Sequence, residues 1–461
     1  MFPALSFKDK TVALFGLGGS GIVTAQSLVA GGAQVVVWDD NENARAKASA
    51  AGLSVASLAD ADWSKFNSFV LSPGVPLTHP KPHWTVDKAK AAGVEIIGDI
   101  EIFCRERALR APHAPFVAIT GTNGKSTTTA LIAHLFKHFG FDVQLGGNIG
   151  VPVLALEAPD NARVHVVECS TFQIDLAPSL NPSVGLLMNL TPDHLDRHGT
   201  MENYAAIKER LVAQSDHAVV CLDDDYCVAV GQRLDEAQVP TTFVAVTHEL
   251  AEGIILRGTQ LIKRHARMEK VLGDLAGIPS LRGKHNGQNA AAAVAAVREV
   301  VPDLSTLQAG LSSFPGLAHR MQEIAREGKI LFVNDSKATN ADAAEKALLA
   351  FRDIFWIIGG KSKEGGIAPL APLFSHVAKA FLIGAASDEF AATLDGKVPY
   401  ERCVTMDVAV ASATRDARAS TAQEPVVLLS PACASYDQFP NFEVRGDAFV
   451  TLVNGIVQPN G

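Results

Sequence analysis

The chain has few cysteines, no long apolar run and no leader-like start, and each absence argues against a class of protein. Six cysteines are scattered among 461 residues without a C-x-x-C pair, which argues against a disulfide scaffold or a cysteine zinc site. The apolar stretch 290–297 ends at Arg298, far short of the ~20 residues that a membrane-spanning helix needs. No basic segment followed by an apolar one opens the chain, so we expect a cytoplasmic protein without an export signal.

Basic residues are not in excess either. The formal net charge is −9 and no basic stripe stands out, so we expect no nucleic-acid partner. Hydrophobic residues make up 48% of the chain, which is enough to bury several cores. At roughly 150 residues per domain, the length predicts about three domains. The chain shows no short internal repeat and no low-complexity tract.

The segment 117–133 carries the strongest functional signal. It reads as the end of an apolar strand, a glycine-containing loop and the start of a helix. Backbone amides of such a loop cradle phosphate, Lys125 would neutralise it, and the Ser126 hydroxyl can bind Mg²⁺. The strict phosphate-loop pattern has a glycine five positions before Gly124, where this chain has Ile119, so the loop is a shortened variant. An ordinary glycine turn is the alternative, but it leaves the lysine and hydroxyl unexplained. We therefore predict nucleoside triphosphate binding.

A second glycine-rich loop lies near the start of the chain. The sequence Gly16-Leu-Gly-Gly-Ser-Gly21 follows an apolar strand and opens a predicted helix, and Asp39 follows the next strand. This is the dinucleotide fingerprint, which taken alone favours a nicotinamide-dependent oxidoreductase. The pattern itself specifies only a tight turn that can face a diphosphate. The later turn at 71–76 either faces the same crevice or is a plain Pro-Gly turn.

Strands and helices alternate through the rest of the chain, which predicts an α/β protein with largely parallel sheets. Short strands between residues 241 and 282 predict a small antiparallel addition to the central sheet. The other predicted strands are 163–167, 184–188, 218–222, 330–333, 354–358, 379–383 and 425–429. Residues 110–115 have the composition of a linker. We predict a Rossmann-like domain at 1–110, a central phosphate-loop domain at 111–316 and a C-terminal Rossmann-like domain at 317–461.

Three further residues invite a chemical interpretation. Glu168 ends an apolar strand, where a carboxylate near a phosphate loop is a natural Mg²⁺ ligand, although it could also cap a helix or face water. The segment 191–198 holds two aspartates that suit a helix N-terminus, while His194 is better explained as a second metal ligand. Lys208 lies in the predicted helix 201–213, and its spacing alone assigns it no role.

The motifs taken together resemble the Mur ligases in their order and spacing, over essentially the whole chain. The resemblance is carried by residues 121–127, 146–150, 168–170, 191–197, 285–289 and 334–340, and it extends through 316–320 and 430–439. It implies an ATP-dependent amide ligase that adds D-glutamate to UDP-N-acetylmuramoyl-L-alanine through an acyl phosphate, in peptidoglycan precursor synthesis. ATP and Mg²⁺ would be the cofactors. Residues 1–110 would bind the UDP substrate, 111–316 would bind ATP, and 317–461 would bind the amino acid and nucleotide. We expect a monomer.

The resemblance also implies roles for individual residues. The catalytic residues would be Lys125, Asn148, His194 and Lys208, with Lys208 carbamylated so that it becomes a carboxylate-like ligand. The Mg²⁺ ligands would be Ser126, Glu168, His194 and Lys208. The ATP site would comprise Gly121, Thr122, Asn123, Gly124, Lys125, Ser126, Thr127, Asn286, Asn289, Arg320, Asp335 and Lys337. The UDP substrate would contact Leu17, Ser20, Asp39, Ser72, Pro73, Gly74 and Asn148, and D-glutamate would contact Thr339, Lys363, Ser430 and Phe439.

The chain departs from the family pattern at two places. Asp40 and Asn41 stand where the family places a hydroxyl and a basic residue against the uridine diphosphate. Either Lys361 or Lys363 could bind the D-glutamate carboxylate, and we choose Lys363. Three alternatives remain: another Mur-type or folylpolyglutamate-type ligase, a nicotinamide-dependent oxidoreductase, and a nucleotide-binding scaffold protein.

Overall fold

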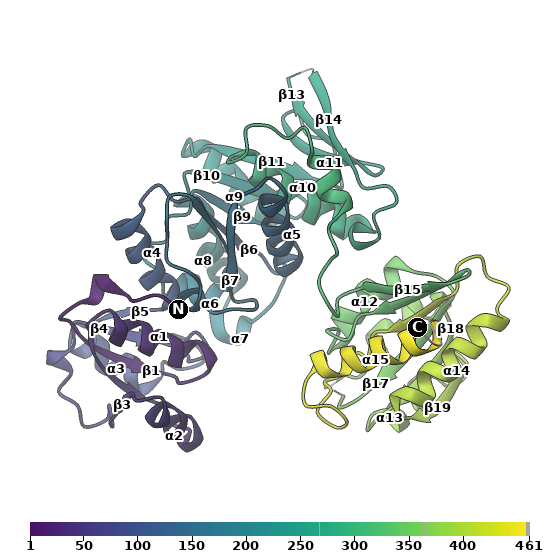
Figure 1. Ribbon diagram of the computed structural model, residues 1–461, viewed down its shortest axis with the longest axis horizontal. Helices are drawn as coiled ribbons and strands as arrows, with labels where there is room; N and C mark the ends of the chain where they lie inside the picture. Colours follow the sequence, from purple (N-terminus) through teal and green to yellow (C-terminus); the bar gives the residue numbers. More distant parts are fainter. Residues whose placement is uncertain (267, 363–364, 458–461) are drawn as a thin grey trace. The chain divides into compact units, whose positions relative to one another are not determined.

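The computed structural model describes residues 1–266, 268–362 and 365–457. These residues form three α/β regions, each built on its own sheet (Figure 1). The chain divides into two compact units. The first comprises Met1–Ala276 with Lys284–Phe314, and the second comprises Gly277–Gly283 with Pro315–Gly461. The first unit holds two of the sheets and the second unit holds the third. The predicted α/β fold with three sheet-based domains is therefore confirmed.

The first sheet is a five-stranded parallel sheet in the order β3-β2-β1-β4-β5. Its strands are β1 Thr11–Phe15, β2 Gln34–Trp38, β3 Ser54–Val55, β4 Ser68–Leu71 and β5 Glu95–Ile97, and its helices are α1 Gly19–Ala30, α2 Glu42–Ala50, α3 Trp84–Ala91 and α4 Asp99–Arg110. The chain direction across the sheet reverses between β1 and β4. Ligands of open α/β sheets bind at such a switch point, outside the carboxyl ends of the strands.

The second sheet has nine strands in the order β14-β13-β12-β11-β10-β9-β6-β8-β7. The strands are β6 Phe116–Thr120, β7 Asp142–Gly147, β8 Arg163–Glu168, β9 Val184–Leu187, β10 His217–Cys221, β11 Thr241–Ala245, β12 Gly253–Arg257, β13 Gln260–His265 and β14 Met268–Asp274. All pairs from β7 to β12 are parallel, and only the pairs made by β13 are antiparallel. The antiparallel addition is thus narrower than expected, because β11 and β12 extend the parallel sheet. Figure 1 shows β13 and β14 at one end of it.

Helices α5 and α10 of this region meet beside the carboxyl end of β6. The helices of the region are α5 Lys125–His138, α6 Thr171–Asp175, α7 Leu195–His198, α8 Met201–Ala213, α9 Asp225–Glu236, α10 Lys284–Arg298 and α11 Leu307–Ser312. Helix α10 packs against α5 and against β9 to β12. Its alanines 290–293 are fully buried, and their small side chains let the neighbouring backbones approach closely. This packing places the start of α10 next to the start of α5.

The third sheet has six strands in the order β15-β16-β20-β17-β18-β19. The strands are β15 Gln322–Glu327, β16 Ile330–Asn334, β17 Ile354–Gly359, β18 Val377–Ile383, β19 Tyr400–Val404 and β20 Val426–Leu429, with helices α12 Ala341–Ala350, α13 Ser387–Leu394, α14 Met406–Ala419 and α15 Phe442–Val457. Only β15 is antiparallel to its neighbour. Figure 1 shows α15 in yellow, and this helix contacts β15, β16 and α14.

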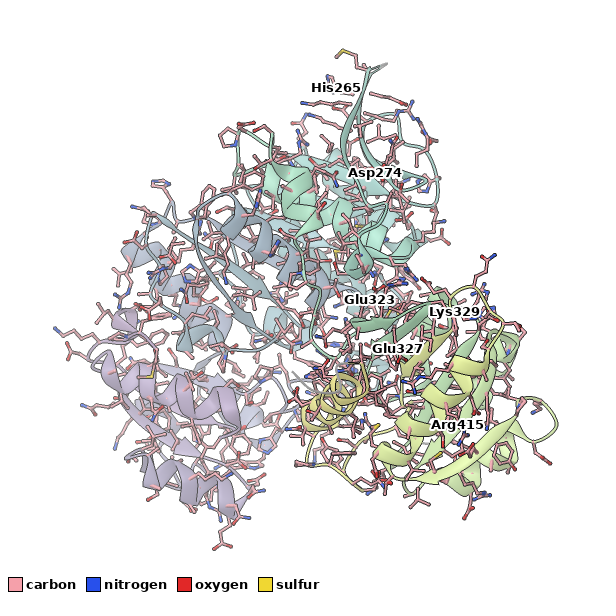
Figure 2. The ribbon with its side chains drawn as sticks, turned by 45° about the vertical axis from the view of Figure 1, so that its right-hand side comes forward. His265, Asp274, Glu323, Glu327, Lys329 and Arg415 are labelled. Atoms are coloured by element: carbon pink, nitrogen blue, oxygen red, sulfur yellow. The ribbon has the colours of Figure 1, made fainter. Side chains whose placement is uncertain are left out.

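The edge strand β15 was not predicted, and its charged side chains explain why. Figure 2 labels Glu323 and Glu327 on this strand and Lys329 beyond it. Glu327 pairs with Arg418 of α14 at 2.6 Å, and Lys329 donates to the carbonyl oxygen of Ser420 at 2.5 Å. Charged residues are typical of edge strands because they discourage pairing with a further chain. The apolar alternation that identifies a half-buried strand is therefore missing here.

Helix α4 joins the first two sheets within the first unit. Arg107 donates to the carbonyl oxygen of Ala114 at 2.9 Å, and Gly98 donates to the carbonyl oxygen of Leu176 at 2.8 Å. The fully buried Glu106 accepts from the backbone of Ser6 at 2.6 Å. These bonds tie the first sheet to the region that carries the phosphate loop. In the part of the chain that the structure describes, no helix combines the length and apolar character that a membrane crossing requires.

Candidate active site

The phosphate loop is formed as predicted between β6 and α5. Gly121 and Gly124 have φ angles of +148° and +82°, which side chains other than glycine rarely adopt. Gly124 directly precedes α5, and no side chain caps the helix there. The first backbone amides of a helix have no partner within the helix, so they are available to an anion. Thr127 lies buried in the same first turn.

Two asparagines of α10 lie against this loop. A Cβ on Gly124 would come within 2.3 Å of the Oδ1 atom of Asn289. Thr128 donates to the same atom at 3.3 Å, and Asn289 donates to Asn286 at 3.0 Å. The predicted nucleotide residues Asn286 and Asn289 are therefore next to the loop although they lie more than a hundred residues away in sequence.

Replacing Gly124 by alanine is expected to raise the KM for ATP about ten- to hundredfold, because a positive φ strains alanine by about 1–3 kcal/mol and its Cβ would collide with Asn289. Gly140, after the other end of α5, provides a matched control. Its φ is +86°, but a Cβ there would meet nothing within 4 Å. Steady-state phosphate release at varied ATP measures both variants. Equal KM values in Gly124→Ala and Gly140→Ala would contradict this role of the close approach.

Lys125 lies over its own loop and Asn189 secures the loop from the other side. The Lys125 Nζ atom donates to the carbonyl oxygens of Gly121 at 2.9 Å and Thr122 at 2.8 Å. The Asn189 side chain accepts from the Asn123 amide at 2.7 Å and donates to the Asn123 carbonyl at 3.1 Å. Asn189 lies outside the motifs that the sequence offered. Its position just after β9, at the carboxyl edge of the sheet, was the available signal.

Glu168 is the centre of a buried polar cluster. Its Oε2 atom accepts from the Ser126 hydroxyl at 2.7 Å, and its Oε1 atom accepts from the Asn148 amide at 2.7 Å. Ser170, rather than Glu168, caps helix α6, and Glu168 is only 2% exposed. The helix-cap and solvent-facing interpretations of Glu168 therefore fail. A carboxylate beside a hydroxyl offers the hard oxygen atoms that Mg²⁺ prefers, so these residues fit the metal.

Lys208 is buried beneath the phosphate loop. Its Nζ atom donates to the Gly121 carbonyl at 2.8 Å and to the Thr120 hydroxyl at 3.2 Å, and it lies 4.8 Å from the ring centroid of Tyr204. Only 2% of the residue is exposed. Burial, followed by the charge of Lys125, holds the pKa of Lys208 well below its usual value. Lys208 is therefore not one of the many helical lysines that face water, although its spacing alone gives no sign of this.

His194 occupies a strained position at the start of α7. Its φ is +53°, and its Nε2 atom is 3.5 Å from a carboxylate oxygen of Asp193. The side chain is half-exposed, and its ring centroid lies 5.2 Å from that of Phe172. Among the described residues, no group of three or more His, Cys, Asp or Glu side chains is arranged to hold a metal ion. The metal-ligand role of His194 remains a prediction.

Asp39 at the end of β2 is used to build the first glycine loop. One carboxylate oxygen accepts from the Leu17 amide at 2.6 Å and the other from the Asn41 amide at 2.8 Å. In dinucleotide-binding enzymes the acidic residue at this position accepts from the ribose hydroxyl. The two backbone bonds give Asp39 a structural reason to be present, so the acidic residue alone does not favour the oxidoreductase interpretation.

The turn after β4 faces this crevice, which decides between the two interpretations of residues 71–76. A small pocket is lined by Gly16 and Ser20 on one side and by Ser72 and Pro73 on the other, with further residues of α1, β1 and β4 and the buried Asp99. The Gly74 carbonyl oxygen accepts from Arg197 of α7 at 3.1 Å. Of the predicted UDP-site residues, Ser20, Ser72 and Pro73 line this pocket, whereas Asn148 bonds to Glu168 beside the second sheet.

Arg45 places a cation near Asp40 and Asn41, where the chain departs from the family pattern. Arg45 of α2 donates to the carbonyl oxygens of Asp39 at 2.7 Å and Asp40 at 3.0 Å. Its guanidinium carbon lies 4.6 Å from the ring centroid of Trp38. The Asp40 carboxylate lies 3.3 Å from His83. The Arg45 guanidinium therefore lies at the end of β2, beside the acidic residues Asp39 and Asp40, although residue 41 is an asparagine.

In the second unit, Asp335 and Ser430 meet at the ends of the neighbouring strands β16 and β20. Ser430 donates to Asp335 at 2.7 Å, and the Met321 amide donates to the other carboxylate oxygen at 3.1 Å. Asp335 is buried, and this burial raises its pKa to about 7. Lys337 donates from its backbone to the His319 carbonyl oxygen at 2.9 Å.

The remaining C-terminal site residues lie on four segments: Arg320 before β15, Thr339 after β16, Lys361 after β17 and Phe439 after β20. Thr339 and Arg320 are half-buried, and Arg320 lowers the pKa of Asp335 against the effect of burial. The half-buried Phe439 donates from its backbone to Ser435 at 2.8 Å. Lys361 forms a short antiparallel bridge with Ala434, whereas Lys363 lies outside the described residues.

Replacing Asp335 by asparagine is expected to stabilise the protein at pH 8 by at most about 4 kcal/mol, with the advantage vanishing toward pH 4. Burial raises the carboxyl pKa from 3.8 to about 7, so the folded state binds a proton more tightly than the unfolded state. Wild-type stability is therefore lost as pH rises between these values. Asparagine can still accept from Met321 and donate to Ser430. Thermal unfolding at several pH values tests this, and an advantage that is larger at pH 5 than at pH 8 would contradict it.

Comparison with known proteins matches most of the chain to the domains of one family. Residues 10–98 match the Mur ligase MurD-like N-terminal domain, residues 119–297 the Mur ligase middle domain and residues 319–433 the Mur ligase glutamate ligase domain. The UDP-N-acetylmuramoylalanine–D-glutamate ligase of Mesorhizobium japonicum is 59% identical over 464 residues, covering 100% of this chain and 99% of the relative. The enzyme of the same name from Agrobacterium fabrum is 58% identical over 453 residues, covering 98% and 97%.

Solved structures show the same fold at low identity. The UDP-N-acetylmuramate–alanine ligase of Thermotoga maritima superposes with a TM-score of 0.58 at 18% identity, covering 97% of this chain and all of that one. A UDP-N-acetylmuramoyl-L-alanyl-D-glutamate–2,6-diaminopimelate ligase superposes with a TM-score of 0.57 at 17% identity, covering 98% and 94%. The resemblance inferred from the sequence motifs is confirmed by the full-length relatives. The chain belongs to the Mur ligase family, with an N-terminal domain of the MurD-like type.

Proposed function

We propose that the chain is the ligase that adds D-glutamate to UDP-N-acetylmuramoyl-L-alanine with the consumption of ATP. The observation that carries the proposal is the cluster in which Glu168 accepts from Ser126 and Asn148 beside the phosphate loop. The full-length relatives that bear this activity in their names support the choice of substrates. The reaction belongs to peptidoglycan precursor synthesis, and hence to cell-wall biogenesis, cell shape and cell division.

The chemistry begins from a poor electrophile. The L-alanyl carboxylate attacks the γ-phosphorus of ATP, which gives an acyl phosphate and ADP. The D-glutamate amine then attacks the acyl carbon, and the tetrahedral intermediate expels phosphate as the amine loses its proton. Phosphoryl transfer requires alignment and charge neutralisation more than covalent help. Lys125 and the amides of residues 121–127 hold the phosphates, and Asn148 orients Glu168 and faces the transferred group.

Mg²⁺, when bound, supplies positive charge against the phosphate oxygens. We assign Ser126, Glu168, His194 and Lys208 to the metal sites. Lys208 takes part as a carbamate: its neutral amine adds CO₂ and releases one proton, which replaces a potential cation by an anion. The lowered pKa of Lys208 supports this assignment, because only the unprotonated amine reacts with CO₂.

The other ligands are assigned to the residues that the family resemblance implies. The UDP substrate binds Leu17, Ser20, Asp39, Ser72, Pro73, Gly74 and Asn148, and Asp39 acts through its backbone contacts. The adenine nucleotide binds Asn286, Asn289, Arg320, Asp335 and Lys337, and D-glutamate binds Thr339, Lys363, Ser430 and Phe439. We retain the domain limits 1–110, 111–316 and 317–461.

We place the reaction in the cytoplasm and the enzyme as a monomer. All six cysteines are buried and free. Free thiols of this kind suit a reducing compartment, which supports the cytoplasmic assignment.

Oxygen-18 transfer tests the acyl-phosphate route. UDP-N-acetylmuramoyl-L-alanine labelled in its carboxylate is incubated with ATP, Mg²⁺ and D-glutamate, and the released phosphate is analysed by mass spectrometry. We expect one labelled oxygen in the phosphate, because the carboxylate oxygen stays with phosphorus when the amide forms. Phosphate without label would show that ATP is hydrolysed by water and would contradict the mechanism.

A further inference from the structure

Arg445 in the first turn of α15 ties two loops of the second unit together. Its Nε atom donates to the Ser336 hydroxyl at 3.0 Å and its Nη2 atom to the Ser336 carbonyl at 2.8 Å. Its Nη1 atom donates to the Cys433 carbonyl at 3.0 Å. The guanidinium presents its donors in a rigid planar fork. One buried group, 1% exposed, therefore fixes the distance between the loop after β16 and the loop after β20.

The same turn of α15 also contacts the loop after β17 and the segment that precedes β15. A Cβ on Gly360, the residue after β17, would lie 3.3 Å from Nη1 of Arg445. The Asn334 side chain donates to the Gly446 carbonyl at 3.2 Å, and a Cβ on Gly446 would lie 2.1 Å from the His319 ring. Neither glycine leaves room for a larger residue, so this turn of α15 packs closely against both segments.

The loops held in this way carry the C-terminal residues of the proposed site. Asp335 and Lys337 flank Ser336, and Ser430 lies three residues before Cys433. Each acceptor that Arg445 contacts is a neutral hydroxyl or carbonyl oxygen. Burial lowers the pKa of Arg445 to about 10, which leaves it charged at neutral pH. A cation thus lies beneath loops assigned to two anionic ligands, where its field favours them.

We propose that Arg445 is a positioning residue for the nucleotide- and D-glutamate-binding loops, acting through Asp335, Lys337 and Ser430. The inference rests on the proposed ligase function. A residue with only a packing role would lower the stability of the unit without a preference among substrates. A positioning residue raises the KM for D-glutamate and ATP while it spares the UDP substrate, whose assigned residues belong to the first unit.

Two substitutions and one control separate these roles. Arg445→Lys keeps the charge but loses the planar fork, and Arg445→Met loses both. Val453→Ala provides the control, because Val453 is a fully buried residue two turns further along α15 in the apolar core. Arg445→Lys is expected to raise the KM for D-glutamate and ATP about tenfold, and Arg445→Met more, with the KM for the UDP substrate changed less than about twofold. Val453→Ala is expected to lower the Tm and to leave all three KM values within about twofold.

Amide hydrogen exchange of residues 334–338 and 430–435 gives a second measurement that needs no substrate. Exchange in these segments is expected to be faster in Arg445→Lys than in Val453→Ala. If Arg445→Lys matches Val453→Ala in both the KM pattern and the exchange, the positioning role is overturned. A wild-type protein that releases no phosphate with D-glutamate would overturn the proposed function instead, and the exchange result would still decide the role of Arg445.

Discussion

Replacing Lys125 by alanine is expected to lower D-glutamate-dependent phosphate release on the order of 10³-fold, because a preorganised cation on the transferring phosphoryl group accounts for losses of this size. In the structure the Lys125 Nζ atom lies over the loop carbonyls of Gly121 and Thr122, from where it can turn toward a bound phosphate. Steady-state turnover at saturating substrates measures the effect.

Lys137 is the matched control for this substitution. It lies in the last turn of the same helix α5 and is exposed to solvent. Lys137→Ala is expected to retain turnover within about twofold, since exposed side chains away from a site contribute little. Near-normal turnover of Lys125→Ala would show that the phosphate loop has been assigned wrongly.

Replacing Lys208 by alanine is expected to reduce turnover on the order of 10²- to 10³-fold, because the carbamate that ligates Mg²⁺ would be lost. Added short carboxylic acids should restore part of the activity by entering the space that the side chain leaves and supplying a carboxylate. Lys208→Arg keeps a positive charge but cannot form the carbamate, so it should be as inactive and should not respond to the acids.

Mass spectrometry of the wild-type protein provides independent evidence on Lys208. A peptide that contains Lys208 should carry the added mass of one CO₂ when it is prepared under conditions that preserve carbamates. Full activity of Lys208→Ala, or of Lys208→Arg, would contradict a metal-ligand role. The buried amine would then serve only to support the loop through Thr120 and Gly121.

The local features could be predicted because neighbouring residues encode them. The phosphate loop needs only the strand, glycines and lysine of segment 117–133, and helix α8 was predicted with the bounds Met201–Ala213 that the structure shows. The glycine loop of the first sheet was likewise indicated by the spacing of Gly16 to Gly21 and of Asp39.

The contacts that assemble the site were not predictable, because they join residues far apart in the chain. Glu168 bonds to Ser126 across 42 positions, and Lys208 reaches Thr120 across 88. Arg445 bonds to Ser336 across 109 positions. No short pattern marks such pairs. A buried lysine on an amphipathic helix looks the same in sequence as one that faces water.

The parallel direction of β11 and β12 escaped prediction for a related reason. Both strands are short and separated by turn-like residues, which resembles a hairpin meander. Direction depends on how the chain crosses between strands. Here β11 and β12 run parallel to β10, and β13 runs in the opposite direction.

An amino-acid panel tests the central claim most directly. The purified protein is incubated with ATP, Mg²⁺ and UDP-N-acetylmuramoyl-L-alanine, together with D-glutamate, L-glutamate, D-alanine or diaminopimelate in separate reactions, and phosphate release is followed. The account predicts sustained release with D-glutamate alone, matched by the amide product in equal amount. Equal release with L-glutamate or diaminopimelate, or a change in NADH absorbance without use of ATP, would contradict it.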